Sequence, residues 1–268
     1  MFGGTRSIES EHPRRRRRQT AFTLIEVLVV IAIIGLLVAV LVPALGQSKE
    51  QARRTVCASN LKQIITATQM YAEQYHGFVP FSLPDFNASL TWIAYQQFSK
   101  PYGYVHLGLL YGGKLIPSPN ILYCSSNELY PHIYPDGWKT FSAGGGIEQR
   151  ATGYMYAIAG QIDKYPKGER VNPRLVDLKR EALVSCMFLG KVDKHQPARV
   201  WPHRGGINVA YADGGVQLVH VRDNLARTAY QLYVANDIGQ MDYFAFCFFK
   251  LLSSDSKWMN AFPWLPPR

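Results

Sequence analysis

The feature that most constrains this chain is an apolar run from Phe22 to Leu45, in which Glu26 is the single charged residue. As an α-helix, a run of about 24 residues spans roughly 36 Å, which is enough to cross a hydrocarbon core of about 30 Å. A cleavable secretory signal has a shorter apolar core, of about 7 to 15 residues, that ends in a small-residue cleavage site. The run therefore predicts a transmembrane helix over residues 22–45.

Five consecutive arginines, Arg14 to Arg18, lie just before the apolar run and predict its orientation. Basic residues beside a membrane-spanning segment stay in the cytoplasm. We therefore expect a single-pass protein of the inner (cytoplasmic) membrane with a cytoplasmic N-terminus. The domain that follows Leu45 is expected to be exported and to be periplasmic or extracellular.

Glu26 needs an explanation of its own, because a carboxylate at membrane depth costs about 2.5 to 3.5 kcal/mol on insertion scales and marks a functional position. No Lys, Arg or His occurs between Phe22 and Gln47, so its partner belongs to another molecule or is an amine made by processing. A cut between Ala21 and Phe22 creates such an amine, which Glu26 of a neighbouring subunit can neutralise. The alternative is a glutamate that is tolerated one turn from the membrane surface.

The sequence Phe22-Thr23-Leu24-Ile25-Glu26 after a short basic leader resembles the prepilin cleavage and N-methylation signal of type IV pilins and type II secretion pseudopilins. The resemblance implies that a prepilin peptidase/N-methyltransferase cuts between Ala21 and Phe22 and methylates the Phe22 amine. It also implies that Phe22 and Glu26 act in assembly, with Glu26 as the fifth mature residue. The chain departs from the family at Ala21, where glycine is usual.

Beyond Gly46 the pattern remains helical but becomes amphipathic, and it predicts a continuation of the helix over residues 46–77 that ends at Gly77 and Pro80. Proline inside a helix removes a backbone hydrogen bond, so a bend is expected at Pro43. The apolar positions recur every three or four residues. They are Cys57, Leu61, Ile64, Ile65, Thr68, Tyr71, Ala72 and Tyr75.

Residues 78–268 are expected to form one exported α+β domain, whose mainly antiparallel sheet packs against the upper half of the long helix. A short helix is expected near Leu107–Tyr111. Strand candidates are rich in β-branched and aromatic residues. They are Ile121–Cys124, Tyr154–Ile162, Leu183–Leu189, Ile207–Tyr211 and Val216–Val221. The last two predict a hairpin, because Asp213-Gly214 between them suits a tight turn. Gly215 also allows a bulged three-residue turn at this position.

The segment from His203 to Gly214 resembles the H-x9-DG signature of a large group of prepilin-like proteins whose exported domain has no established chemistry. The predicted hairpin, residues 203–221, carries this motif, and Gly215 stands where a histidine commonly follows the DG pair. The motif residues, whose role the resemblance does not give, are His203, Gly205, Gly206, Asn208, Asp213 and Gly214.

His203 and Asp213 admit two interpretations. They are a catalytic or metal-binding pair, with His195 or His220 as helpers, or they are a strand cap and a turn residue. We favour the second, because Asp before Gly is explained by turn chemistry. The chain shows no serine-histidine-aspartate order, phosphate-binding glycine loop or paired-cysteine motif. We therefore expect no enzyme activity, no cofactor and no metal.

The four cysteines, Cys57, Cys124, Cys186 and Cys247, show no CxxC spacing. In an oxidising exported compartment, a Cys57–Cys124 disulfide can join the amphipathic helix to the first strand, at positions where related sequences often carry cysteines. The competing interpretation is a set of buried, reduced thiols.

The net charge is +10. Residues 1–21 form the basic leader and hold six arginines against Glu9 and Glu11, or +4, which leaves +6 for the rest. Those charges are scattered, so nucleic acid is not an expected partner. The family resemblance implies a structural subunit or minor component of a type IV pilus-like or type II secretion pseudopilus fibre, with other pilin-like subunits and the membrane as partners. The alternatives are a membrane-tethered extracytoplasmic binding module, for example for carbohydrate, and a tethered hydrolase that uses His203 and Asp213.

Overall fold

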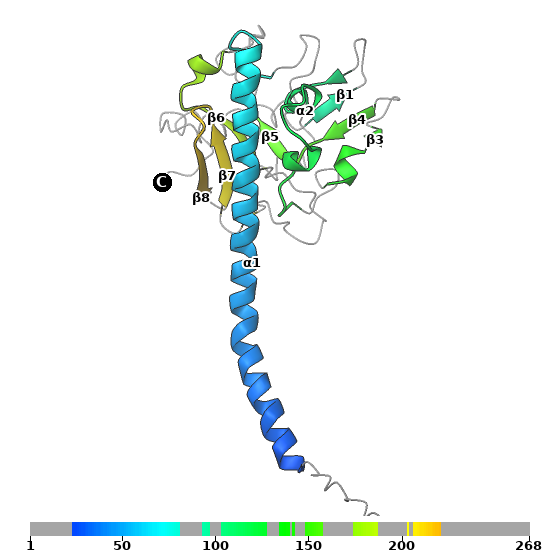
Figure 1. The fold of residues 1–268 in the computed structure, drawn as a ribbon, viewed down its shortest axis with the longest axis vertical. Coiled ribbons are helices and arrows are strands. Elements are labelled where there is room, and N and C mark those ends of the chain that lie inside the picture. Colours follow the sequence, from blue (N-terminus) through cyan, green and yellow to red (C-terminus); the bar gives the residue numbers. More distant parts are fainter. Residues whose placement is uncertain are drawn as a thin grey trace, which may run out of the picture. The chain divides into compact units, whose positions relative to one another are not determined.

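The computed structural model describes residues 23–80, 93–96, 103–127, 134–139, 141–142, 148–157, 174–186, 203 and 206–220. It divides into two units, Met1–Gln47 and Ser48–Arg268. The first described element is the long helix α1, Leu24–Gln74, which begins in the first unit and ends in the second (Figure 1).

In the first unit, α1 is apolar apart from Glu26 and Gln47, and its residues are exposed. Every residue from 23 to 47 is exposed, including Leu24, Ile34 and Leu45. Among the described residues, α1 is the one helix that is long and apolar enough to cross a membrane. The predicted apolar helix is confirmed. Pro43 lies inside it, and the bend expected there stays a prediction.

In the second unit, one face of α1 is buried, as the three- and four-residue spacing predicts. Its buried residues are Cys57, Leu61, Ile64, Ile65, Ala67, Thr68 and Ala72. Tyr71 is half-buried and stacks on Tyr75, which is 48% exposed, so the buried stripe ends one turn earlier than expected. The helix ends where the Gly77 N–H donates to the Ala72 carbonyl at 2.7 Å, with Gly77 at φ +88°.

Within the described residues, eight short strands form two antiparallel sheets of four. The first sheet has the order β2-β1-β4-β3 and consists of β1 (Ile93–Gln96), β2 (Gly103–Tyr104), β3 (Phe141–Ser142) and β4 (Glu148–Ala151). None of these strands was expected from the sequence.

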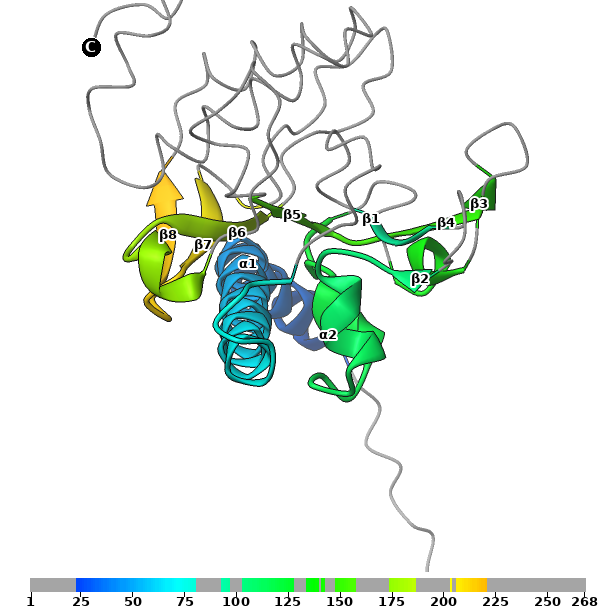
Figure 2. The ribbon, with the colours of Figure 1, turned by 90° about the horizontal axis from the view of Figure 1, so that it is seen from above.

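The second sheet has the order β5-β6-β7-β8 and contains four of the five predicted strands. Its members are β5 (Tyr154–Tyr156), β6 (Ala182–Cys186), β7 (Gly206–Tyr211) and β8 (Val216–His220). The predicted ends of three strands, at residues 158–162, 187–189 and 221, lie outside the described residues. Figure 2 shows the second-unit part of α1 lying along one face of this sheet. The predicted α+β class, a long helix on an antiparallel sheet, is confirmed.

One connected core joins this part of α1 to the middle of the chain and to the second sheet. The helix expected near Leu107–Tyr111 is α2, Gly108–Gly112. The strand expected at Ile121–Cys124 is wrong, because Pro119–Leu122 forms the 3-10 helix η1. Pro119 fixes a helical φ and has no N–H for a strand ladder, so the apolar side chains after it are buried from a helical turn. Two further 3-10 helices are η2 (Asp136–Trp138) and η4 (Leu175–Leu178).

The turn between β7 and β8 is the bulged three-residue form. The Tyr211 N–H donates to the Gly215 carbonyl at 2.8 Å, and Gly214 has φ +89°. The Asp213 Oδ1 atom accepts the Gly215 N–H at 2.8 Å. The turn is held against α1, because the Lys62 ammonium donates to the Gly214 carbonyl at 2.9 Å.

Gly214→Val is expected to destabilise the second unit by about 1 to 2 kcal/mol, since a β-branched residue is strained at positive φ. Asp213→Asn is expected to cost under about 0.5 kcal/mol, because the amide oxygen of asparagine accepts the same Gly215 N–H. Thermal melts of both variants in detergent measure the difference. A larger loss for Asp213→Asn than for Gly214→Val would contradict the turn interpretation.

Candidate functional site

Glu26 has a partner within its own chain. The Thr23 N–H donates to Glu26 Oε2 at 2.8 Å, the Thr23 hydroxyl donates to the same oxygen at 2.7 Å, and the Glu26 N–H donates to Thr23 Oγ1 at 3.3 Å. This reciprocal arrangement is a capping box at the start of α1. The T-x-x-E spacing of Thr23 and Glu26 is the sequence signal of this capping box. Ala21 and Phe22 lie outside the described residues.

The structure does not bring His203 and Asp213 together. They lie beyond opposite ends of β7, and six extended residues span roughly 20 Å. Asp213 is exposed in the turn, where its Oδ2 atom lies 3.6 Å from Arg180 Nε. The arrangement therefore does not favour the interpretation of these two residues as a catalytic or metal-binding pair.

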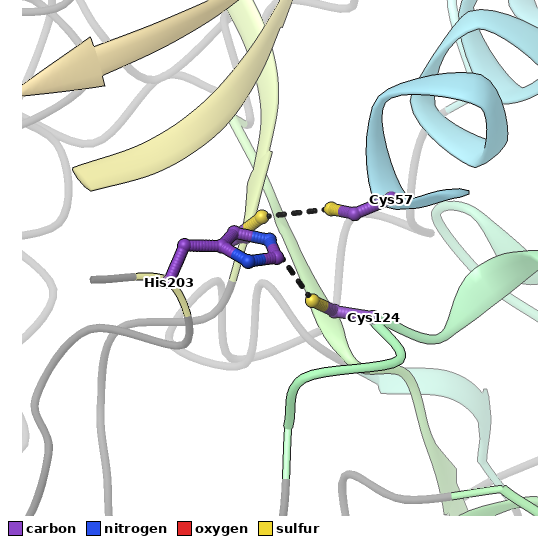
Figure 3. A group of neighbouring side chains, drawn as sticks. Cys57, Cys124 and His203 are labelled. Carbon is purple, nitrogen blue, oxygen red and sulfur yellow. Dashed lines mark hydrogen bonds between the residues drawn. The ribbon is translucent and has the colours of Figure 1, made fainter. Parts of the chain in front are cut away.

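His203 instead lies with three cysteines, which we call the cysteine–histidine cluster: Cys57, Cys124, Cys186 and His203. Their side-chain donor atoms all lie within 4.8 Å of one another. The Cys57 and Cys186 sulfurs are 3.1 Å apart, and the Cys124 sulfur lies 3.5 Å from His203 Nε2. Figure 3 shows the Cys57 and Cys124 side chains and the His203 imidazole pointing toward one another.

Four separate segments supply the cluster. Cys57 lies on the buried face of α1, Cys124 follows η1, Cys186 is the last residue of β6, and His203 forms a bridge with Gly206 at the start of β7. All four residues are at most 3% exposed. The cluster therefore sits where the long helix, the middle of the chain and the second sheet meet.

Further polar groups surround the cluster. His203 Nδ1, the ring nitrogen that points away from Cys124, lies 3.4 Å from Glu50 Oε1. The same Glu50 oxygen accepts from Arg54 Nε at 3.1 Å. The Tyr154 hydroxyl donates to the Cys57 sulfur at 3.5 Å. His203 and Cys57 thus each lie next to a polar group from outside the cluster that limits their orientation.

The three thiols have different acidities. Burial raises the pKa of Cys57, but the hydrogen bonds from Cys124, Cys186, His203 and Asn208 outweigh burial and hold that pKa well below its ordinary value. For Cys124, the hydrogen bond with Cys186 lowers the pKa, but the bond with Cys57 and burial raise it overall. Burial is the largest cause of the raised pKa of Cys186. Cys57 is therefore the most acidic of the three thiols.

No sequence pattern marks this cluster, because its members are far apart along the chain. Cys57 and Cys186 are separated by 129 positions, and Cys124 and His203 by 79. In the structure, Cys57, Cys124 and Cys186 are free thiols. The Cys57–Cys124 disulfide stays a prediction, and Cys186 is the neighbour that sequence reasoning missed.

The other H-x9-DG residues hold the hairpin in place. A Cβ atom on Gly206 would lie 2.6 Å from the Val219 carbonyl oxygen of β8, so this position needs glycine. The Asn208 amide donates to the Arg54 carbonyl of α1 at 3.0 Å. Gly205 lies outside the described residues. Gly206 thus has a structural role between β7 and β8, and Asn208 has one at the helix–sheet interface.

Comparison with known proteins defines the class of the N-terminal segment. Residues 16–42 match the family model of the prokaryotic N-terminal methylation motif, which covers the last six residues of the basic leader, Phe22 and Glu26. The chain therefore carries a prepilin-type N-terminal segment, as the sequence predicts.

The relatives are pseudopilins of type II secretion. The type II secretion system core protein G of Pseudomonas aeruginosa is 44% identical over 57 residues, and those of Aeromonas hydrophila and Klebsiella michiganensis are 42% and 40% identical over the same length. The matched segment is 21% of this chain and 40% of each relative. The chain is thus homologous to these pseudopilins in its N-terminal part. No solved structure matches the chain.

Proposed function

We propose that this protein is a structural, non-enzymatic subunit or minor component of a type IV pilus-like or type II secretion pseudopilus fibre. The observation that carries the proposal is the methylation motif at residues 16–42, shared with core protein G of type II secretion systems. The second support is physical. The apolar residues of α1 up to Leu45 are exposed in the single chain, so they need a membrane before assembly and neighbouring helices afterwards.

The same proposal assigns a role to each segment of the chain. Residues 1–21 are a cytoplasmic leader that a prepilin peptidase/N-methyltransferase removes, and residues 22–45 span the inner membrane and later form the fibre core. Residues 46–77 continue the helix, and residues 78–268 are the exported domain, periplasmic or extracellular, with the H-x9-DG hairpin. Arg14 to Arg18 hold the N-terminus in the cytoplasm. The other partners are further pilin-like subunits.

The mature protein is expected to begin with N-methylated Phe22. Mass spectrometry of the N-terminal peptide from purified membranes measures this directly. Ala21→Trp is expected to abolish processing, because the peptidase accommodates a small residue before the cut, whereas Ala21→Gly is the matched control that is processed at least as well. An intact leader on the unmodified chain would contradict the proposal.

Shearing fibres from cells and identifying this chain among their subunits tests the assembly role. A second candidate function is a membrane-tethered binding module, for example for carbohydrate, that uses the signal only for delivery. It is favoured by the limit of the homology, since the matched 57 residues are 21% of the chain. A processed chain that stays in the membrane and never enters fibres would support the tethered module instead.

A further inference from the structure

The cysteine–histidine cluster has a use that goes beyond fibre assembly. We propose that Cys57, Cys124, Cys186 and His203 bind one zinc ion in a closed, tetrahedral Cys3His site that stabilises the exported domain. This proposal replaces the expectation from the sequence that the chain binds no metal.

The donor set favours zinc. Thiolate and imidazole ligands suit zinc among the common biological metals, and Cys3His is one of the standard donor sets of structural zinc sites. Hard cations such as calcium and magnesium need oxygen ligands, and all four donors of the cluster are sulfur or nitrogen. Because the four residues are at most 3% exposed, the site leaves no coordination position for water or substrate. A structural role follows, since a catalytic zinc keeps one position open.

The distances are close to those that a zinc ion sets. With Zn–S bonds of about 2.3 Å and a Zn–N bond of about 2.0 to 2.1 Å, tetrahedral angles place sulfurs about 3.8 Å apart and sulfur about 3.6 Å from nitrogen. The 3.5 Å between Cys124 Sγ and His203 Nε2 matches the second value. The 3.1 Å between the Cys57 and Cys186 sulfurs requires an opening of about 0.7 Å. A small side-chain rotation supplies that opening.

The groups around the cluster are those that a zinc ligand set needs. A histidine that binds zinc through one nitrogen ordinarily presents the other to a carboxylate, which fixes the tautomer and the ring orientation. His203 directs Nε2 toward Cys124 and has Glu50 Oε1 3.4 Å from Nδ1. Nδ1 is buried and has no well-oriented hydrogen-bond acceptor among the described residues. A metal on Nε2 keeps the proton on Nδ1, where Glu50 attracts it. Tyr154 in turn donates to the Cys57 sulfur.

A disulfide explains less of this arrangement. A disulfide between Cys57 and Cys186 accounts for two of the four residues. It does not explain why Cys124 and His203 are buried next to them. A zinc ion uses all four. A zinc ion also links residues that are 129 and 79 positions apart in the chain. A link that closes a long loop stabilises the folded state most, because it removes the most conformational entropy from the unfolded chain.

The test uses the full chain, purified in detergent under reducing conditions, with metal content measured by inductively coupled plasma mass spectrometry. We expect one zinc per chain, and a loss of at least tenfold in bound zinc for Cys186→Ser and for His203→Ala. Cys247→Ser and His220→Ala are the matched controls and are expected to keep one zinc per chain. Removing zinc with a chelator is expected to lower the melting temperature, and adding zinc back is expected to restore it.

Two further measurements keep the test informative if a ligand variant fails to fold. Cobalt(II) added to the zinc-free unmodified chain is expected to give the intense visible absorption of a tetrahedral site with thiolate-to-cobalt charge transfer. Glu50→Gln retains the four ligands and is expected to weaken zinc binding about 10- to 100-fold, whereas Glu73→Gln, exposed on the same helix, leaves it unchanged.

Three results would overturn the proposal. The first is a chain that contains no zinc and gives no tetrahedral cobalt spectrum. The second is a Cys57–Cys186 or Cys57–Cys124 disulfide, found by mass spectrometry of the chain isolated from cells without reductant. The third is a full complement of zinc in Cys186→Ser and His203→Ala. Fibre assembly enters none of these readouts, so the zinc proposal and the proposed function fail or stand separately.

Discussion

Replacing Gly108 with alanine is expected to lower the free energy of unfolding by about 3 kcal/mol, which corresponds to a drop of roughly 10 °C in melting temperature. Gly108 is the first residue of α2, where an alanine ordinarily stabilises a helix by about 0.5 to 1 kcal/mol relative to glycine. At Gly108 alanine is instead expected to be destabilising. An added Cβ atom would lie 1.8 Å from the Ala94 carbonyl oxygen of β1, which already accepts the Val105 N–H at 2.9 Å. The backbone must move and break that hydrogen bond.

Gly103→Ala provides the matched control. Gly103 lies in β2 of the same sheet, and a Cβ atom there has nothing within 4 Å. We expect a change of less than about 0.5 kcal/mol for this variant. Thermal melts of both variants in detergent, followed by near-ultraviolet circular dichroism, measure the difference. Equal melting temperatures for Gly108→Ala and the unmodified chain would contradict the packing of α2 against β1.

The long helix and the second sheet are the parts of the fold that the sequence predicts well. The apolar run and the three- and four-residue spacing that follows are long, regular signals, and they identify α1 and most of its buried face. Strands β7 and β8 are predicted to within one residue, because β-branched residues lie on both sides of an Asp-Gly turn.

The first sheet was missed because its strands are too short to carry an alternating pattern. The strands β2 and β3 have two residues each, and β1 and β4 have four. Their pairing depends on contacts between distant segments, such as Tyr95 of β1 opposite Tyr104 of β2. In such cases tertiary packing, rather than local propensity, decides whether a strand forms.

The candidate site was predicted only in part for the same reason. His203 was selected from the sequence, but the local Asp213-Gly214 motif suggested the wrong neighbour, since β7 keeps the two residues at its opposite ends. Cysteines that bind metal are recognised by close spacing in the chain. Here the helix, the turn after η1 and the end of β6 bring them together, and only the folded chain shows that arrangement.

Glu26 is expected to have two separable roles, and its substitution is expected to have the largest effect on assembly. Its carboxylate caps α1 through Thr23, and under the proposed function it also neutralises the Phe22 amine of a neighbouring subunit in the fibre. Glu26→Gln separates these roles, because glutamine at this position retains a side-chain oxygen for the capping box but has no charge. Thr23→Val removes the capping hydroxyl and retains the charge.

Glu26→Leu is expected to reduce incorporation into fibres at least tenfold while the amount of processed protein in the membrane stays unchanged or rises. Removing the carboxylate relieves about 2.5 to 3.5 kcal/mol of insertion cost, so membrane levels do not fall. In the fibre, the same change leaves the neighbouring amine buried without a counter-charge, at a cost of about 2 to 5 kcal/mol. Because about 1.4 kcal/mol corresponds to a factor of ten, this cost reduces incorporation at least tenfold. Quantitative immunoblots of sheared fibres and of membranes measure the two pools. If charge pairing drives assembly, Glu26→Gln is lost from fibres as Glu26→Leu is, and Thr23→Val assembles normally. Normal assembly of Glu26→Gln would instead show that Glu26 only caps the helix.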